Sequence, residues 1–464
     1  MSRVEHDLLG ERELPDDAYW GIHTLRAREN FPITGETVGD VADLVDALAA
    51  VKLASAEANR QLGRLDAERA EAIVAACEEI RAGALHDQFV VDLIQGGAGT
   101  STNMNANEVI ANRALELLGC ERGDYDRLHP NEHVNLSQST NDVYPTALRL
   151  AAIAATRRLQ AAVGALAAAF GAKAAEFADV VKIGRTQLQD AVPMTVGQEL
   201  GACRSTLLEE VERLGDALPL LHEINLGATA IGTGITTPPG YARCVGERLA
   251  AVTGLPLVAA PDLIEATQDT GAFVALSGVL KRLATKLIKI CNDLRLLSSG
   301  PQGGIGELQL PPRQAGSSIM PGKVNPVIPE VVNQIAFAAI GNDVTVTLAA
   351  QGGQLQLNPF EPIIFRALRE SFDQLTAGCH VLADACVAGI RVDRAQLARR
   401  AETSVALCTA LAPQIGYAAA TVVAQEALAT GRGVAELVLE RRLLGEAELA
   451  AAILALGRPP GVSA

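Results

Sequence analysis

The chain has 464 residues, 49% of them hydrophobic but only 3% aromatic, and carries a formal net charge of -15. This length exceeds what one hydrophobic core usually serves, so two or three structural units are expected. Because the apolar content is mostly alanine and aliphatic side chains, which suit closely packed helices, we predict an all-α protein. The acidic charge argues against nucleic acid as a partner, since phosphate binding needs a basic surface.

The N-terminal stretch MSRVEHDLLGERELPDD is charged from its start and lacks the apolar core of a signal peptide. No stretch of the chain is long and apolar enough to span a bilayer without charges. The eight cysteines form no CxxC pair and lie mostly in apolar helical stretches, which is typical of reduced core residues. These features predict a cytoplasmic protein with no membrane partner.

Three predicted domains follow one another along the chain. Residues 1–140 mix short helical stretches with Gly, Pro and Asn and form the first domain. From residue 141, apolar side chains recur at helical spacing from Leu159 to Phe177, and the same period returns from Leu276 to Leu294. With further helices expected over 196–223 and 329–390, residues 141–395 are predicted to be a central bundle, which favours oligomers. Residues 396–464 form a small helical domain.

Four segments interrupt the helical pattern, at residues 95–108, 129–145, 184–193 and 298–329. Each combines Gly or Pro with hydroxyl and amide side chains, which are groups that bind carboxylate oxygens. A polar loop at a helix start also offers free backbone N–H groups to an anion. Taken singly, each segment is better explained by helix capping, but four such segments in one chain favour a carboxylate-binding site.

Other chemical motifs are weak or missing. The GGIG stretch at 303–306 lacks the spacing of a dinucleotide site and follows no predicted strand. His129 and His133 are four residues apart, but Pro130 lies between them and there is no HExxH pattern, so no metal site is predicted. Neither a GxSxG elbow nor a Cys/His nucleophile signature occurs. No cofactor is expected to be required.

The stretch GSSIMPGKVNP at 316–326 resembles the signature of the fumarase and aspartase superfamily, G-S-x-x-M-x-x-K-x-N. The blocks QGGAGTSTNMNANE, HVNLSQSTNDVYPT, GRTQLQDAVPMT, NLGATAIGTG and QLQLNPFEP are similar to those of the aspartate ammonia-lyase branch, and the similarity covers nearly the whole chain. The resemblance implies three all-α domains, a central five-helix bundle and a homotetramer whose active sites each collect loops from three subunits. It leaves open whether Mg²⁺ activates the enzyme.

The chemistry that the resemblance implies is a reversible β-elimination of ammonia from a small dicarboxylate, L-aspartate, through an aci-carboxylate intermediate to fumarate. The general base would be Ser317, acting as an alkoxide that nearby N–H groups and Lys323 stabilise. The donors to the β-carboxylate would be Thr100, Ser101, Ser139, Thr140 and Ser318.

The remaining predicted roles concern the other end of the substrate. The resemblance places Lys323, Asn325 and Thr186 at the α-carboxylate. It places Asn141 and Gln187 near the amino group and assigns Glu330 as a supporting acid beside the serine loop.

The main alternative is a class II fumarate hydratase, which shares the fold and the serine loop but eliminates water from malate. Fumarases typically carry His where this chain has Gln187 and often Lys where it has Glu361, and their GGTAVGTG block differs from NLGATAIGTG. A second alternative is a non-enzymatic structural member of the superfamily, which could have lost the loop chemistry. Because the serine, lysine and asparagine of the loop are all present, the ammonia-lyase interpretation is preferred.

Overall fold

The computed structural model describes residues 2–455, and the structure divides this chain into two compact units. The first unit comprises the described parts of Met1–Leu159, Arg213–Arg282 and Phe337–Gln374. The second comprises the described parts of Gln160–Glu212, Leu283–Ala336 and Leu375–Ala464. Every boundary between the units falls within a long helix, so each of these helices contributes one segment to each unit.

The first unit has its core around one buried helix. Most side chains of α2 (Ala42–Gln61) are buried, among them Leu44, Leu48 and Val51, because apolar residues occupy nearly every face of this helix. Helix α2 packs against α3 and α7. The other elements of this unit are β1 (Ser2–Asp7), β2 (Gly10–Pro15), α1 (Ile22–Asn30), α3 (Ala67–Arg81), α4 (Thr100–Leu117), β5 (Glu223–Ile224), α7 (Tyr241–Thr253), β6 (Val258–Ala259) and α8 (Leu263–Gln268).

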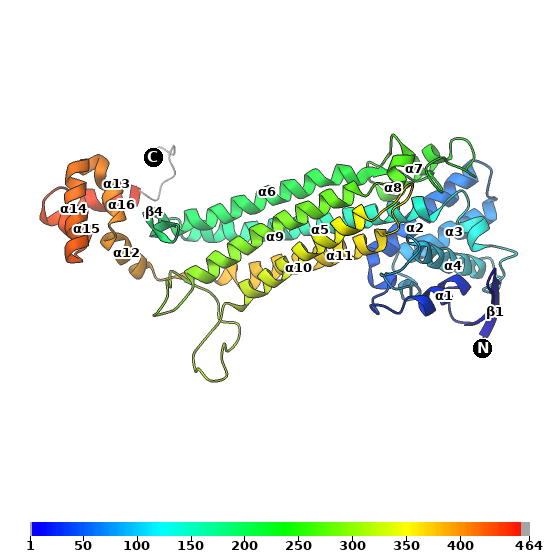
Figure 1. Ribbon diagram of the computed structural model, residues 1–464, viewed down its shortest axis with the longest axis horizontal. Coiled ribbons are helices and arrows are strands. Elements are labelled where there is room, and N and C mark those ends of the chain that lie inside the picture. Colours follow the sequence, from blue (N-terminus) through cyan, green and yellow to red (C-terminus); the bar gives the residue numbers. More distant parts are fainter. Residues whose placement is uncertain (1, 456–464) are drawn as a thin grey trace. The chain divides into compact units, whose positions relative to one another are not determined.

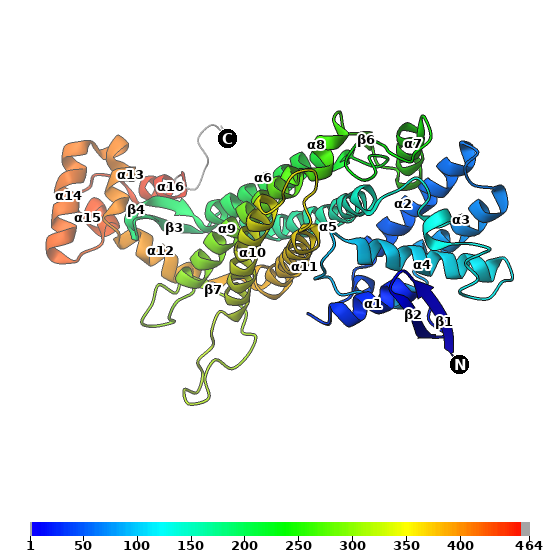
Figure 2. The same ribbon diagram turned by 45° about the vertical axis from the view of Figure 1, so that its right-hand side comes forward.

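The long helices are α5 (Thr140–Glu176), α6 (Val196–His222), α9 (Gly271–Leu297), α10 (Val327–Gln351) and α11 (Glu361–Ala385). Figures 1 and 2 both show α9, α10 and α11 running alongside one another. The stripe of α5 that predicted a helix is buried from Leu159 to Phe177, which confirms that prediction. The helical stretch expected over 329–390 consists of α10 and α11, which the segment 352–360 separates.

The second unit carries the C-terminal helices and a hairpin. The hairpin pairs β3 (Val181–Thr186) with β4 (Gln189–Thr195) in antiparallel register, and Figure 2 shows it beside α12 and α13, which it contacts. Apolar side chains of α13, α14 and α15, such as Leu411, Val423 and Leu437, form the local core. The remaining elements are β7 (Leu308–Gln309), β8 (Arg391–Val392), α12 (Arg394–Thr403), α13 (Ala406–Ile415), α14 (Tyr417–Thr430), α15 (Val434–Glu440) and α16 (Glu446–Ala455).

The fold is mainly helical, as predicted, but two of the expected interruptions are partly helical. Helix α4 begins at Thr100 inside the segment 95–108, and α5 begins at Thr140 inside 129–145. The reason is that Asn103 and other polar side chains there are buried and hydrogen-bonded within the fold rather than solvated in a loop. The short strand pairs were not predicted. The segment between α9 and α10 is a long loop that extends away from the helices, as Figure 1 shows.

Helix α10 has one further property. Among residues 2–455 it is the one helix whose length and composition would suffice to cross a membrane, and it carries Glu330 and Asp343. Several of its apolar side chains are exposed, including Phe337, Val344 and Leu348.

Candidate active site

The first candidate segment is the turn that starts α4. Gly99 has a φ of 86° and lies against the buried ring of Tyr144: a Cβ added at Gly99 would fall 2.3 Å from that ring. Only glycine fits this position. The turn places Thr100, whose Oγ1 donates to the Gly97 carbonyl at 2.8 Å, and the buried Ser101 at the N-terminus of α4. Backbone N–H groups at such a helix start favour an anion.

The second candidate segment starts α5 and joins the first. The Ser139 amide donates to Asp142 Oδ1 at 3.0 Å, and Ser139 Oγ accepts from the Asn141 amide at 3.3 Å, which caps the helix. Asn103 Nδ2 donates to Thr140 Oγ1 at 3.1 Å, so a residue of the first turn of α4 holds the second segment. The structure therefore brings these predicted residues of the two segments together within the first unit.

A third segment, 225–230, completes this group. Asn141 Nδ2 donates to the Ala230 carbonyl at 2.7 Å, and Asn225 Nδ2 donates to the Asn141 carbonyl at 3.0 Å. Asp142 accepts from the amides of Gly227 and Thr229 at 3.1 and 2.8 Å. Burial raises the pKa of Asp142 to about 6, although these backbone hydrogen bonds and Lys52 oppose the rise.

The serine loop lies in the second unit and is closed by its own backbone. The Gly316 amide donates to the Lys323 carbonyl at 2.7 Å, and Asn325 Nδ2 donates to the Gly316 carbonyl at 3.0 Å. Inside this closure, Ser317 Oγ accepts hydrogen bonds from the amides of Ile319 and Met320 at 3.2 and 3.0 Å. Two N–H groups that converge on one hydroxyl oxygen stabilise negative charge on it.

A cavity of about 790 Å³ opens beside this loop. Lys323, Asn325 and Glu330 all line it, and Arg295 lies 3.8 Å from Glu330. Ser317 and Ser318 belong to the same loop but are not among the lining residues; Ser317 is half-buried and Ser318 is exposed. The structure thus gathers three of the predicted residues around one cavity and places the two serines on the adjoining turn.

The remaining predicted residues, Thr186 and Gln187, are exposed at the tip of the β3–β4 hairpin. Gln187 and Leu188 have φ values of 54° and 66°, which are typical of a two-residue hairpin turn. Arg185, next to this turn, contacts the buried Glu307 at 2.7 Å. The position of the turn is therefore fixed by an ion pair.

Glu307 is the centre of a buried charge cluster. Lys182 Nζ, also fully buried, lies 2.8 Å from Glu307 and 2.7 Å from Glu199. Burial alone would raise the pKa of Glu307, but the hydrogen bonds from Arg185 and Lys182 outweigh it and lower that pKa. Glu307 therefore keeps its negative charge, which the two cations need because charge without a partner is costly in a protein interior.

Glu361, the residue that separates this sequence from typical fumarases, is buried at the first position of α11. Burial raises its pKa to about 8, and Arg149 opposes that rise. Glu361 is therefore largely protonated at neutral pH.

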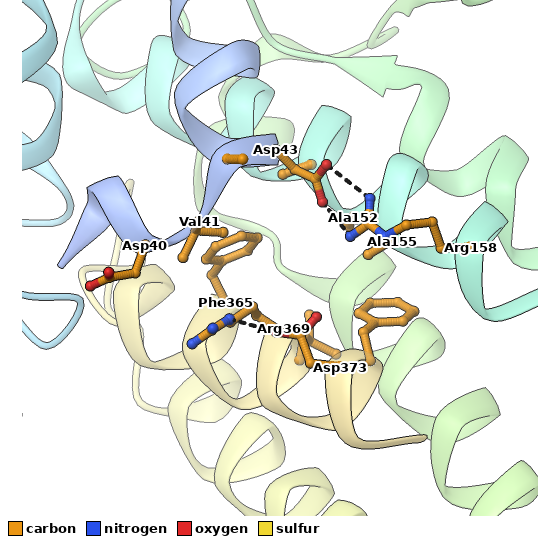
Figure 3. A pocket seen from close by; sticks show the side chains of 13 residues that line it. Asp40, Val41, Asp43, Ala152, Ala155, Arg158, Phe365, Arg369 and Asp373 are labelled. Carbon is orange, nitrogen blue, oxygen red and sulfur yellow. Dashed lines mark hydrogen bonds and ion pairs between the residues drawn. The ribbon is translucent and has the colours of Figure 1, made fainter. Parts of the chain in front are cut away.

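A separate cavity of about 330 Å³ lies in the first unit and contains none of the predicted site residues. Figure 3 shows its apolar wall with Phe365 and its rim, where Arg158 holds Asp43 through two hydrogen bonds. On the same rim, Arg369 pairs with Asp373 at 2.8 Å. Because these rim cations are already paired with carboxylates, this cavity does not match the expected dicarboxylate site.

The donor set for a metal ion is poor. Across residues 2–455 the structure forms no cluster of three or more His, Cys, Asp and Glu side chains that could bind a metal. Mg²⁺ prefers several oxygen ligands around it, so the described residues do not fit a resident Mg²⁺.

Comparison with known proteins identifies the family. The family model described as Lyase matches residues 10–341, and that described as Fumarase C C-terminus matches residues 407–454. The chain belongs to the fumarase/aspartase superfamily of lyases. It is 58% identical over 454 residues to an aspartate ammonia-lyase of Pseudomonas aeruginosa, which covers 98% of this chain and 96% of that protein.

Solved structures of the superfamily agree with this assignment. The chain is similar to the fumarate lyase:delta crystallin of Brucella melitensis bound to cobalt, with a TM-score of 0.95, 54% identity and coverage of 99% of this chain and 100% of that one. It is also similar to the class II fumarase of Schistosoma mansoni, with a TM-score of 0.91, 35% identity and the same coverage. The predictions of family and fold are therefore confirmed.

Sequence reasoning missed several residues that support the site. Asn103, Asn225 and Asp142 position the predicted side chains but were not predicted to do so, although each lies inside a recognised block. Their place in these blocks was one available signal, and the burial of the polar side chains Asn103 and Asn225 marks them as hydrogen-bonded members of the fold.

Proposed function

We propose that this superfamily member is an aspartate ammonia-lyase that converts L-aspartate reversibly to fumarate and ammonia. The observation that carries the proposal is the closed serine loop, in which two backbone N–H groups converge on Ser317 Oγ. A serine is a poor base until its anion is stabilised, and this loop offers that stabilisation in a chain whose relatives include aspartate ammonia-lyases at 52 to 58% identity.

The elimination proceeds in two steps. The alkoxide of Ser317 removes one proton from C3 of the substrate and becomes a neutral hydroxyl, and the electron pair of the broken C–H bond moves into the β-carboxyl group as an aci-carboxylate. The electrons then return to form the C2–C3 double bond while the C2–N bond breaks, so the ammonium group of the substrate leaves as ammonia. The transient dianionic carboxylate needs preorganised donors.

The proposed donors come from the segments described above. Thr100, Ser101, Ser139 and Thr140 offer hydroxyl and backbone groups to the β-carboxylate, together with Ser318. Lys323 supplies a positive charge at the α-carboxylate, where Asn325 and Thr186 complete the binding. Holding both carboxylates orients one C3 proton toward the base.

The amino group of the substrate is proposed to lie between Asn141 and Gln187, and Glu330 supports the loop as an acid. Among these residues, Glu330 already lies within 3.8 Å of Arg295. Its carboxyl group therefore stands beside a cation at the cavity wall.

We further propose a homotetramer in which each active site collects loops from three subunits. Support comes from α10, whose side chains Phe337, Val344 and Leu348 are exposed in this single chain. Their spacing of seven and four residues places them along one side of the helix, as in helices that pack against a partner. The division into domains 1–140, 141–395 and 396–464 remains part of this proposal.

A cytoplasmic location is also proposed. All eight cysteines are free thiols, and most are buried, which suits a reducing compartment.

The test is to supply purified protein with L-aspartate or with L-malate and to follow fumarate by its ultraviolet absorbance. We expect turnover of L-aspartate. Turnover of malate without turnover of aspartate would favour the second candidate, a fumarate hydratase, which the similarity to the Schistosoma mansoni class II fumarase keeps in consideration. Turnover of neither substrate would favour a structural member of the superfamily.

A further inference from the structure

Lys52 occupies an unusual place for a lysine. It lies in the middle of α2, its side chain is fully buried, and apolar residues such as Val51 and Leu53 flank it. Burial lowers the pKa of Lys52 to about 7, although the attraction of Asp142 opposes this. A charged ammonium group in such a place costs free energy, so its retention calls for a compensating role.

The hydrogen-bond partners of Lys52 are neutral. Its Nζ donates to Asn135 Oδ1 and to Gln138 Oε1, each at 2.9 Å. Of the ionisable groups that attract it, burial raises the pKa of Cys77 to about 12, which keeps that thiol neutral, and Asp142 is occupied by three backbone amides. Within the described part of the chain, no direct ion pair therefore neutralises the ammonium charge of Lys52.

Both partners belong to the segment that leads into the start of α5. Asn135 Oδ1 also accepts from Asn103 Nδ2 at 3.1 Å and from Asn107 Nδ2 at 3.2 Å. Asn103 Nδ2 in turn donates to Thr140 Oγ1. A chain of hydrogen bonds thus links the ammonium group to a hydroxyl that the proposed function places at the β-carboxylate.

The second partner fixes the backbone before Ser139. The amide Nδ2 of Asn135 donates to the Gln138 carbonyl at 3.3 Å, and Gln138 Nε2 donates to the Val134 and Leu136 carbonyls at 2.9 and 3.1 Å. Because Lys52 donates to the side-chain oxygens of Asn135 and Gln138, it also fixes the orientation of these two amide groups. Lys52 therefore helps to fix the orientation of segment 134–138.

We infer that Lys52 is a positioning residue of the elimination reaction: its buried ammonium group orients Asn135 and Gln138, and through them and Asn103 it presents Thr140 to the substrate's β-carboxylate. When protonated, Lys52 also places a positive charge at the end of the hydrogen-bond chain that leads to Thr140, a proposed donor to the dianionic aci-carboxylate. In a protein interior, a fixed positive charge stabilises negative charge that develops in the transition state more than negative charge already present in the ground state. This inference rests on the proposed function.

Lys52→Met tests it, because methionine has a similar length and carries neither charge nor N–H donors. We expect kcat for L-aspartate to fall about 100-fold, as when a preorganised donor is removed, while KM changes less than about threefold. Lys52→Arg, which keeps the charge, is expected to recover part of kcat. The matched control is Leu48→Ala, a fully buried residue of the same helix: it lowers the melting temperature and leaves kcat within about twofold.

A second variant keeps the inference testable if Lys52→Met does not fold. Asn135→Asp retains an oxygen acceptor for Lys52 but neutralises its charge with a carboxylate, so the protein stays folded while kcat falls. Unchanged kcat in either folded variant, or a change confined to KM, would overturn the role of Lys52. Failure of the proposed function is distinguishable, because then the unsubstituted protein itself releases no ammonia from L-aspartate.

Discussion

Gly99→Ala perturbs the turn that carries Thr100 and Ser101, and a second glycine in the same turn provides its control. Gly99 and Gly97 have left-handed φ values of 86° and 92°. A Cβ at Gly97 would meet only Thr100, at 3.8 Å, whereas a Cβ at Gly99 would fall 2.3 Å from the buried ring of Tyr144. The two substitutions therefore share the backbone strain and differ in one steric clash.

The magnitude follows from these two contributions. A left-handed alanine costs about 1–2 kcal/mol, which is the whole expected effect of Gly97→Ala. Displacing the ring of Tyr144 in a packed interior adds about 1–3 kcal/mol, so Gly99→Ala should destabilise by about 2–5 kcal/mol. Because the same displacement moves the N-terminus of α4, kcat for L-aspartate should also fall by about 100-fold in Gly99→Ala.

The measurement is thermal unfolding together with steady-state kinetics on both variants. We expect a larger loss of melting temperature and of kcat for Gly99→Ala than for Gly97→Ala. Equal effects of the two substitutions would show that contact with Tyr144 does not position this turn, and the reasoning would be refuted.

Three further predictions concern other parts of the molecule. Glu307→Gln removes the carboxylate that Lys182 and Arg185 share, while Lys182 keeps Glu199 at 2.7 Å, so it should destabilise by about 1–3 kcal/mol and raise KM. Urea unfolding and kinetics measure these effects, and unchanged stability would contradict the buried cluster. The folded pKa of Glu361, about 8, lies above its value in an unfolded chain, so its contribution to stability is full at low pH and is lost as pH rises. The fall in melting temperature between about pH 5 and about pH 9 should therefore be smaller in Glu361→Gln, and equal slopes would argue against a buried neutral carboxyl. Phe337→Asp on the exposed side of α10 should shift the protein from tetramer to smaller species in size-exclusion chromatography, and an unchanged tetramer would exclude that surface from the interface.

Helical periodicity accounts for most of the fold that could be predicted. The stripe from Leu159 to Phe177 repeats at helical spacing over five turns, and such a pattern has no alternative in a strand. The β3–β4 hairpin was not predicted, because its short strands are interrupted by Gly184 and Pro193 and its turn depends on the left-handed Gln187 and Leu188 rather than on glycine.

The sequence predicted which segments form the candidate site, but not how their side chains are arranged in space. The signature around Ser317 is local in sequence, so its loop closure by Asn325 lies within the matched block. Lys52 could not be found in this way: in a helix rich in alanine, a single lysine is normally solvated, and only the packing of α2 shows that it is buried. Asn103 was likewise counted in a loop, although its partners make it a buried member of α4.

The central claim is that Ser317 is the general base, and the direct test is kcat for L-aspartate in Ser317→Ala, with the neighbouring Ser318→Ala as control. Both side chains lie on the same turn, and each substitution removes one hydroxyl. We predict that Ser317→Ala remains a folded oligomer and loses about 1,000-fold or more in kcat, whereas Ser318→Ala loses only what one donor contributes, about 10- to 100-fold. A Ser317→Ala rate within about twofold of the unsubstituted protein would contradict the claim.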